Sequence, residues 1–248
     1  ERSDVDILVR MNNPYNGNIT SRLSSRLQDR YREEATFFDG DYSIDDFQQD
    51  VYDELQAIYG TRAITRYDKA LVIDSNHCQL EMDADVVPCQ QHRIYTGFNG
   101  DQNDSSNYYK GIRFKTQNNK EITSFPERHI SNGEEMNDAC NGNYKETIRM
   151  FKNARDWLVE HDRLDEGIAP SYYIECLLYN VPAKYFRTTN LRDRYSDIVS
   201  HLDSTNLQSY KAQNDVESLF GRGETQWGRV EALRFVNQLQ WLWENGAY

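Results

Sequence analysis

Two pairs of aspartates come directly before aliphatic, strand-like stretches of the sequence. Asp4 and Asp6 form the first pair, and Asp83 and Asp85 form the second. Side chains alternate along a β-strand, so both members of a pair point to the same face. Carboxylates on apolar strands are costly to bury without a counter-ion, and Mg²⁺ binds one or two carboxylates together with phosphate oxygens and water. The pattern therefore predicts a divalent-metal site with ligands from both strands.

Solvated surface acids are the alternative explanation of the same aspartates. The chain contains 40 acidic residues, and a third D-x-D, Asp39-Gly40-Asp41, reads as a loop. The two pairs named above differ from it because each runs into a β-type apolar stretch. On the residues alone, a metal site and a solvated surface both remain open.

A cationic stripe is the second chemical feature. Lys145, Arg149 and Lys152 follow one another at i, i+4 and i+7, so they share one face of a helix predicted over 143–161. Facing a cleft, such a stripe would neutralise phosphate charge. Facing water, it would be an ordinary solvated surface, and both interpretations remain.

The start of the next predicted helix, over 170–180, offers an anion site. A helix N-terminus presents unpaired amides to anions, and Ser171 adds a hydroxyl donor there. The adjacent Tyr172 could stack on a nucleobase. Alternatively, Ser171 only caps the helix and Tyr172 is a core aromatic. Glu175, further along this helix, is expected to be structural.

The aspartates require strands to position them. The first half of the chain alternates in the manner of strands, with hairpin turns predicted at Ser75-Asn76-His77 and Asn118-Asn119. The expected strands cover residues 4–11, 63–74 and 78–88, with a further hairpin over 108–125.

Helices are expected between and after these strands. Residues 12–42 read as a partly helical surface insertion, and an amphipathic helix over 43–60 begins after Ser43 and ends at Gly60. Apolar residues recur at helical spacing through the second half of the chain, after a joining region near 126–142. The helices expected there cover 143–161, 170–180, 191–203 and 227–245.

The order of these elements predicts an α+β protein with two lobes. Residues 1–130 form a mixed-sheet lobe and residues 131–248 a helical lobe. The chain has a net charge of −12 and lacks the basic surface that binding of long nucleic acid requires. Such a partner is therefore not expected. The chain contains no run of 18 apolar residues, so no transmembrane helix is predicted.

The remaining reactive side chains suggest no further site. The four cysteines are widely spaced without a C-x-x-C pair, and the first residues lack the features of a signal peptide. A reduced, cytoplasmic protein is therefore expected. The five histidines show no metal-ligand spacing and are assigned no role; they are His77, His92, His129, His161 and His201.

Five segments together resemble a known enzyme family. In order along nearly the whole chain, they resemble the template-independent branch of the polymerase-β-like nucleotidyltransferases, which includes oligoadenylate synthetases and cGAS. The bacterial cGAS/DncV-like nucleotidyltransferases (CD-NTases) are the most similar members. The segments are Ser3 to Val9, Asp83 to Cys89, Phe125 to His129, Lys145 to Lys152, and Pro170 to Leu178.

The resemblance implies a fold and an activity. The fold would be a polymerase-β-like nucleotidyltransferase lobe followed by a helical lobe that completes the nucleotide cleft. The activity would be synthesis of a cyclic di- or trinucleotide from NTPs, with release of pyrophosphate. In bacteria the product usually activates an antiphage effector protein. Whether activity is constitutive or set by a regulatory protein partner stays open, as do base preference and linkage.

The resemblance also implies roles for particular residues. The third metal-binding acid would be Asp85 rather than Asp83, because it directly precedes the aliphatic-aliphatic-proline run. The family's phosphate-gripping Gly-Ser loop would lie upstream of Glu1, so the N-terminal part of the catalytic core is expected to be missing from this sequence. A two-metal Mg²⁺ or Mn²⁺ site would use Asp4, Asp6 and Asp85, and nucleotide binding would use Ser3, Lys145, Lys152, Ser171 and Tyr172.

Two other functions are compatible with the residues. A nucleotidyltransferase toxin would modify a macromolecular acceptor such as tRNA or a protein, although the negative charge argues against tRNA. A catalytically idle nucleotide-binding module would typically have lost one of the acids, whereas Asp4, Asp6 and Asp85 are all present.

Overall fold

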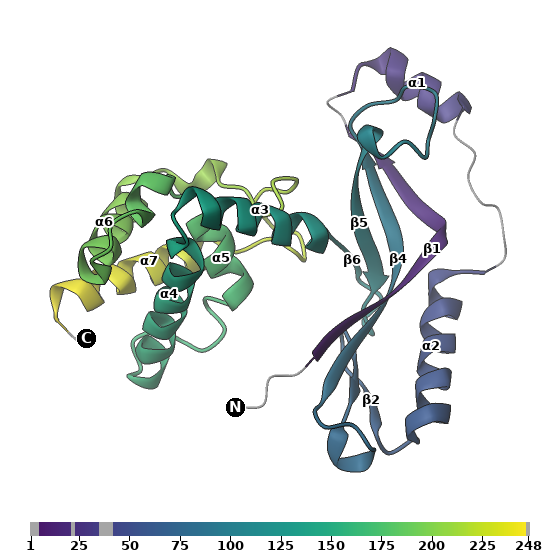
Figure 1. Ribbon diagram of the computed structural model, residues 1–248, viewed down its shortest axis with the longest axis horizontal. Helices are drawn as coiled ribbons and strands as arrows, with labels where there is room; N and C mark the ends of the chain where they lie inside the picture. Colours follow the sequence, from purple (N-terminus) through teal and green to yellow (C-terminus); the bar gives the residue numbers. More distant parts are fainter. Residues whose placement is uncertain (1–4, 21–22, 35–41, 247–248) are drawn as a thin grey trace. The chain divides into compact units, whose positions relative to one another are not determined.

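A computed structural model describes residues 5–20, 23–34 and 42–246 (Figure 1). The chain divides into two compact units, Glu1–Phe125 and Pro126–Tyr248. The first is built on a sheet and the second on helices, so the predicted α+β class is confirmed. Within the described residues, no helix combines the length and the apolar character that a membrane crossing demands.

One mixed sheet organises the first unit. Its strands run in the order β2-β3-β4-β5-β6, and all neighbours on this path are antiparallel. The long strand β4 is central, because β1 pairs with it in parallel along its other edge. The strands are β1 Val5–Ile19, β2 Ile64–Arg66, β3 Leu71–Ile73, β4 Ala84–Tyr95, β5 Tyr108–Lys115 and β6 Glu121–Ser124.

Three predicted segments of this unit differ from the structure. The strand expected over 78–88 begins only at Ala84 and continues to Tyr95. The single strand expected over 63–74 is a hairpin, because the chain turns at Tyr67, whose amide donates to Ala70 O at 2.9 Å. The insertion expected over 12–42 is wrong at its start, since β1 continues to Ile19. Its Asn- and Gly-rich sequence suggested a loop, but after an irregularity in register it pairs with the second half of β4.

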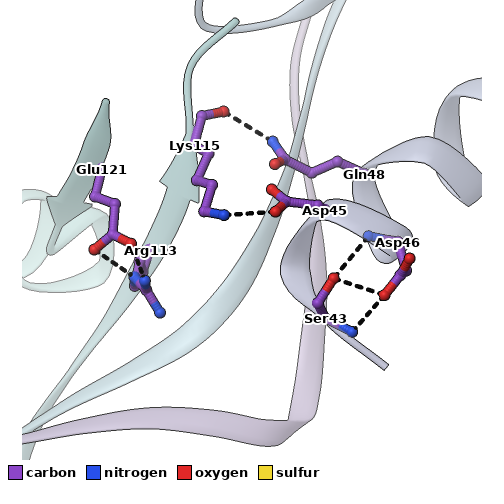
Figure 2. Close-up of polar contacts among 7 residues, drawn as sticks. All are labelled: Ser43, Asp45, Asp46, Gln48, Arg113, Lys115 and Glu121. Atoms are coloured by element: carbon purple, nitrogen blue, oxygen red, sulfur yellow. Dashed lines mark hydrogen bonds and ion pairs between the residues drawn. The ribbon is translucent and has the colours of Figure 1, made fainter. Parts of the chain in front are cut away.

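Helix α2 (Ile44–Tyr59) packs on one face of the sheet, where Val51 and Leu55 contact the core of β2, β3 and β4. The predicted ends are confirmed: Ser43 and Asp46 form a reciprocal capping box, and Gly60 has a φ of 89°. Figure 2 shows how the helix start is also held to β5. There Lys115 forms an ion pair with Asp45, and its carbonyl oxygen accepts from Gln48, while Arg113 pairs with Glu121 across β5 and β6.

An aromatic cluster closes the other end of the sheet. Helix α1 (Ser25–Glu34) contributes Tyr31, which packs against Tyr95 and Phe98. The Arg93 guanidinium lies 3.7 Å from the centre of the Tyr15 ring, and Tyr108 covers it at 4.5 Å. These contacts fix β1 against β4 beyond the irregularity in their pairing.

Five α-helices are described in the second unit. The four helices predicted from periodicity are confirmed within a few residues. The joining region expected near 126–142 is instead a helix, α3. Only Gly133 of its residues is buried, so its sequence lacks the apolar stripe that predicts a helix. The helices are α3 Pro126–Ala139, α4 Asn143–Glu160, α5 Ser171–Tyr179, α6 Leu191–Ser204 and α7 Arg229–Glu244.

Apolar faces of α4, α5, α6 and α7 meet in one core. The predicted inward residues of α4 are all buried: Tyr144, Ile148, Phe151 and Leu158. A charged residue is enclosed with them. Arg194 on α6 is 1% exposed, and it donates to Glu146, Thr147 and the carbonyl oxygen of Thr188.

Candidate functional site

The sheet register brings two of the predicted acids together. Asp6 on β1 is paired with Asp85 on β4 in the parallel ladder. Neighbouring strands lie about 4.8 Å apart, and paired residues point to the same face. Because Ala84 and Val86 face α2, Asp6 and Asp85 lie on the opposite face of the sheet. Asp6 is exposed and Asp85 half-buried, so a ligand could reach both.

Asp83 is engaged elsewhere. Its Oδ1 accepts from the backbone amide of Ser75 at 2.8 Å and from the Ser75 hydroxyl at 2.6 Å. These bonds tie β4 to the 3₁₀ turn Ser75–His77 that follows β3. A carboxylate oxygen that already accepts two hydrogen bonds has little capacity left for a cation, so Oδ1 of Asp83 serves to hold this turn.

Two sequence-predicted residues, Ser3 and Asp4, lie outside the described residues. Over 5–20, 23–34 and 42–246, no group of three or more His, Cys, Asp or Glu side chains forms a ligand cluster. The paired Asp6 and Asp85 nevertheless fit a hard divalent cation, since two carboxylates with phosphate oxygens and water are a typical Mg²⁺ ligand set.

The helical unit contains a cationic pocket of about 310 Å³. All three residues of the predicted stripe on α4 line it, and Glu175 is the one carboxylate among the lining residues. Apolar residues and one side-chain amide also line the pocket. They come from α3, α4 and the loop after α6. The lining residues are His129, Ile130, Gly133, Tyr144, Lys145, Ile148, Arg149, Lys152, Glu175 and Gln213.

Glu175 connects Lys152 to a histidine. Lys152 Nζ donates to Glu175 Oε1 at 2.6 Å, and His129 Nε2 lies 2.9 Å from Oε2. Burial alone would raise the pKa of Glu175, but the hydrogen bonds from His129 and Lys152 outweigh burial and lower it. The carboxylate is therefore charged at neutral pH.

Ser171 and Tyr172 stand at the start of α5, as predicted. Ser171 is its exposed first residue, and Pro170 precedes it as the cap. Tyr172 is half-buried, and its ring stacks on His129 with centroids 5.1 Å apart. Burial raises the pKa of Tyr172, so its hydroxyl stays protonated. Tyr173 packs against the core, where it stacks on Trp227.

Three residues of this site were not predicted from sequence. His129 was assigned no role and Glu175 only a structural one, yet both contact candidate ligand-binding residues. Gln213 is buried in the loop after α6, donates to His129 O and accepts from the Tyr144 hydroxyl. Only Glu175 carried a usable signal, because it lies one helical turn after Tyr172.

Known proteins are similar to this chain over both of its units. The cGAS/DncV-like nucleotidyltransferase C-terminal helical domain family matches residues 131–244. A cyclic UMP-AMP synthase from Rhodothermus marinus is 34% identical over 242 residues, which are 97% of this chain and 78% of that protein. A cyclic nucleotide synthase, CdnE01, from Staphylococcus haemolyticus is 34% identical over 244 residues, covering 97% of this chain and 79% of the relative.

A solved structure shows the same fold. The Rhodothermus marinus CdnE c-UMP-AMP synthase with Apcpp and Upnpp superposes with a TM-score of 0.83 at 34% identity. The match covers 98% of this chain and 78% of that one. Similarity of this extent, in sequence and in structure, includes both the strands that carry the paired acids and the helices that line the pocket.

Proposed function

The chain belongs to the cGAS/DncV-like nucleotidyltransferases, and on this basis we propose that it joins nucleoside triphosphates into a cyclic di- or trinucleotide. It is a nucleotidyltransferase by its relationship to named cyclic nucleotide synthases. The observation that carries the proposal is the register of β1 and β4, which pairs Asp6 with Asp85 on the face opposite α2. That pairing supports the proposal because it brings two carboxylates together on one face of the sheet.

We assign metal binding to Asp6 and Asp85, together with Asp4. These residues would hold Mg²⁺ or Mn²⁺ in a two-metal site. A bound divalent cation would lower the pKa of the attacking hydroxyl and neutralise charge on the departing pyrophosphate. Asp83 holds the turn at Ser75 and is left out of the ligand set.

The nucleotide would be held by residues of the helical unit and by Ser3. Lys152, with Lys145 beside it in the cationic pocket, would bind the β- and γ-phosphates, and Ser171 would add a hydroxyl donor. Tyr172 would stack on a base, a contact worth about 1–3 kcal/mol and tolerant of base identity.

The reaction needs positioning more than covalent help from the protein. A ribose hydroxyl of the acceptor nucleotide attacks the α-phosphate of the donor in line. The bond between the α-phosphate and the bridging oxygen breaks, and pyrophosphate leaves. Catalysis then consists of aligning the two nucleotides and stabilising the charge on the phosphates, as in other phosphoryl transfers. A second transfer closes the ring of a dinucleotide, and a third closes that of a trinucleotide.

The biological setting follows from the family. We propose that the cyclic product passes to an effector protein in antiphage signalling in the bacterial cytoplasm. Regulation by a protein partner is compatible with this role. The support is the relationship to named cyclic nucleotide synthases of bacteria.

Incubation of the full-length protein with ATP, GTP, CTP, UTP and Mg²⁺ tests the proposal. Mass spectrometry should find a cyclic di- or trinucleotide together with pyrophosphate, without any macromolecular acceptor. The Asp6→Asn protein is the control and should give none. Label transferred to added tRNA or protein, with no small cyclic product, would instead identify an acceptor-modifying nucleotidyltransferase.

A further inference from the structure

Glu175 joins three helices of the helical unit. Its Oε1 accepts from Lys152 on α4 at 2.6 Å, and its Oε2 lies 2.9 Å from the Nε2 of His129 on α3. Glu175 itself belongs to α5. Each carboxylate oxygen is therefore engaged by a different helix, and a charge-assisted hydrogen bond fixes geometry more strongly than a neutral one.

His129 extends this connection to Tyr172. The two rings stack at 5.1 Å with their planes inclined by 21°. Tyr172 lies three residues before Glu175, on the same side of α5. His129 Nδ1 is buried without a hydrogen-bond partner in the described part of the chain, so we assign the ring proton to Nε2, which donates it to Glu175.

We propose that Glu175 is a positioning residue that presets Lys152 and Tyr172 for the same nucleotide. The inference rests on the proposed function, in which Lys152 binds the triphosphate and Tyr172 stacks on the base. Glu175 holds the lysine directly and the tyrosine through His129. One carboxylate thus sets both the phosphate-binding group and the base-stacking ring.

Two effects of Glu175 on phosphate binding oppose each other. Its charge competes with phosphate for Lys152, but Oε1 takes only one of the three donors of the ammonium group, so we expect this competition to cost about a few-fold in affinity. Freezing a free lysine side chain on binding costs about ten-fold or more. Positioning therefore outweighs competition. Lys145 and Arg149, which have no carboxylate partner within the described residues, keep the pocket positively charged.

Two ligands separate the two arms of the network. Inorganic tripolyphosphate has no base and reports on the Lys152 arm alone. The non-hydrolysable NTP analogue that binds the wild-type protein best, chosen from the four α,β-methylene NTPs, reports on both arms. Affinities are measured by calorimetry with Mg²⁺ present.

Glu175→Gln keeps the side-chain length but replaces the carboxylate by a neutral amide, so the charge-assisted bond that holds Lys152 is weakened whichever way the amide is turned. We expect this variant to bind tripolyphosphate about ten-fold more weakly. If Glu175 acts through Lys152, the Lys152→Met, Glu175→Gln double variant should bind tripolyphosphate no more weakly than Lys152→Met alone. Unchanged or tighter binding by Glu175→Gln, or additive losses in the double variant, would overturn the proposal.

His129→Gln retains a donor near the Nε2 position but removes the stacked ring. It should bind tripolyphosphate like the wild type, while its affinity for the NTP analogue falls about three- to ten-fold. His129→Phe retains the ring and loses the link to Glu175, and its loss for the NTP analogue should be smaller. A clear loss of tripolyphosphate affinity in either variant would contradict the separate arms.

A matched control comes from an ion pair outside the pocket. Asp165→Asn removes the pair with Arg234, which lies at 2.8 Å on the same unit, and should leave both affinities unchanged. Failure of the wild-type protein to bind any NTP analogue would overturn the proposed function, and the inference with it. If all Glu175 and His129 variants bound both ligands as tightly as the wild type does, the inference would be overturned and the proposed function would stand.

Discussion

The two units position their candidate groups in different ways. In the sheet unit, the backbone ladder between β1 and β4 sets Asp6 beside Asp85, and no side-chain contact is needed. In the helical unit, Lys152 and Tyr172 are held by side chains from three helices that converge on Glu175 and Gln213. One site is defined by register and the other by a side-chain network.

This difference determines what a substitution damages. A strand register is fixed by many hydrogen bonds and by the buried face, so changing one exposed acid removes a ligand and little else. A side-chain network in a partly buried pocket loses both packing and orientation when one member changes. We therefore expect substitutions in the sheet unit to separate activity from stability, and those in the helical unit to couple them.

The largest effect is expected at Asp85. Asp85→Asn should reduce product formation by about 10³-fold, because it removes a charged ligand from the proposed metal site while the strand stays paired. The free energy of unfolding should change far less, by about 1 kcal/mol at most. Initial rates of pyrophosphate release and urea denaturation provide the two measurements.

Asp83→Asn is the matched control on the same strand. It weakens the bonds to Ser75, so it should cost about 1 kcal/mol of stability and leave the rate within a few-fold of wild type. If Asp83→Asn were as inactive as Asp85→Asn, Asp83 would be a ligand, and the choice between the two acids would be wrong.

A smaller but still large effect is expected at Arg194, inside the helical core. Arg194→Met preserves volume but removes bonds to Glu146, Thr147 and Thr188. The loss should be about 3 kcal/mol in the free energy of unfolding, because buried polar partners are left behind.

Tryptophan fluorescence during denaturation measures this loss selectively, since all four tryptophans lie in residues 126–248. Glu146→Gln serves as the comparison. Its side chain is 48% exposed and can be hydrated, so about 1 kcal/mol is expected. Equal stability of Arg194→Met and the wild type would show that the buried arginine contributes nothing net to the core.

Local patterns predicted most of the elements. The cap at Ser43, the stop at Gly60 and the 3.6-residue periodicity of α4 are short-range signals, and the structure follows them. The hairpin of β2 and β3 was missed because the four residues between the strands, 67–70, contain neither glycine nor proline to indicate a turn. Helix α3 was missed because it buries almost nothing, so its sequence lacks an apolar stripe.

The residues of the candidate site also differ in how far local sequence patterns predict them. Strand alternation and a shared aliphatic context pointed to two pairs of acids, Asp4 with Asp6 and Asp83 with Asp85, and the family resemblance chose Asp85 over Asp83. The register then pairs Asp85 with Asp6, because it preserves what the sequence spacing implies. The histidine at 129 could not be found in this way. Its contacts with Glu175 and Tyr172 join residues 43 or more positions apart, and such pairings depend on helix packing rather than on spacing.

The smallest expected effect tests how far the helical network extends. A Cβ at Gly133 would lie 2.5 Å from Gln213 Nε2, and that amide cannot yield freely because it donates to His129 O while its oxygen accepts from Tyr144. Gly133→Ala should therefore cost about 1–2 kcal/mol, even though alanine is the better helix former. Because Gln213 also holds the backbone of His129, NTP affinity should fall about two- to three-fold in parallel. Fluorescence-monitored denaturation and calorimetry provide the two values. Destabilisation with unchanged NTP affinity would show that the side-chain network ends at Gln213 and that the pocket is set by Glu175 and its two partners alone.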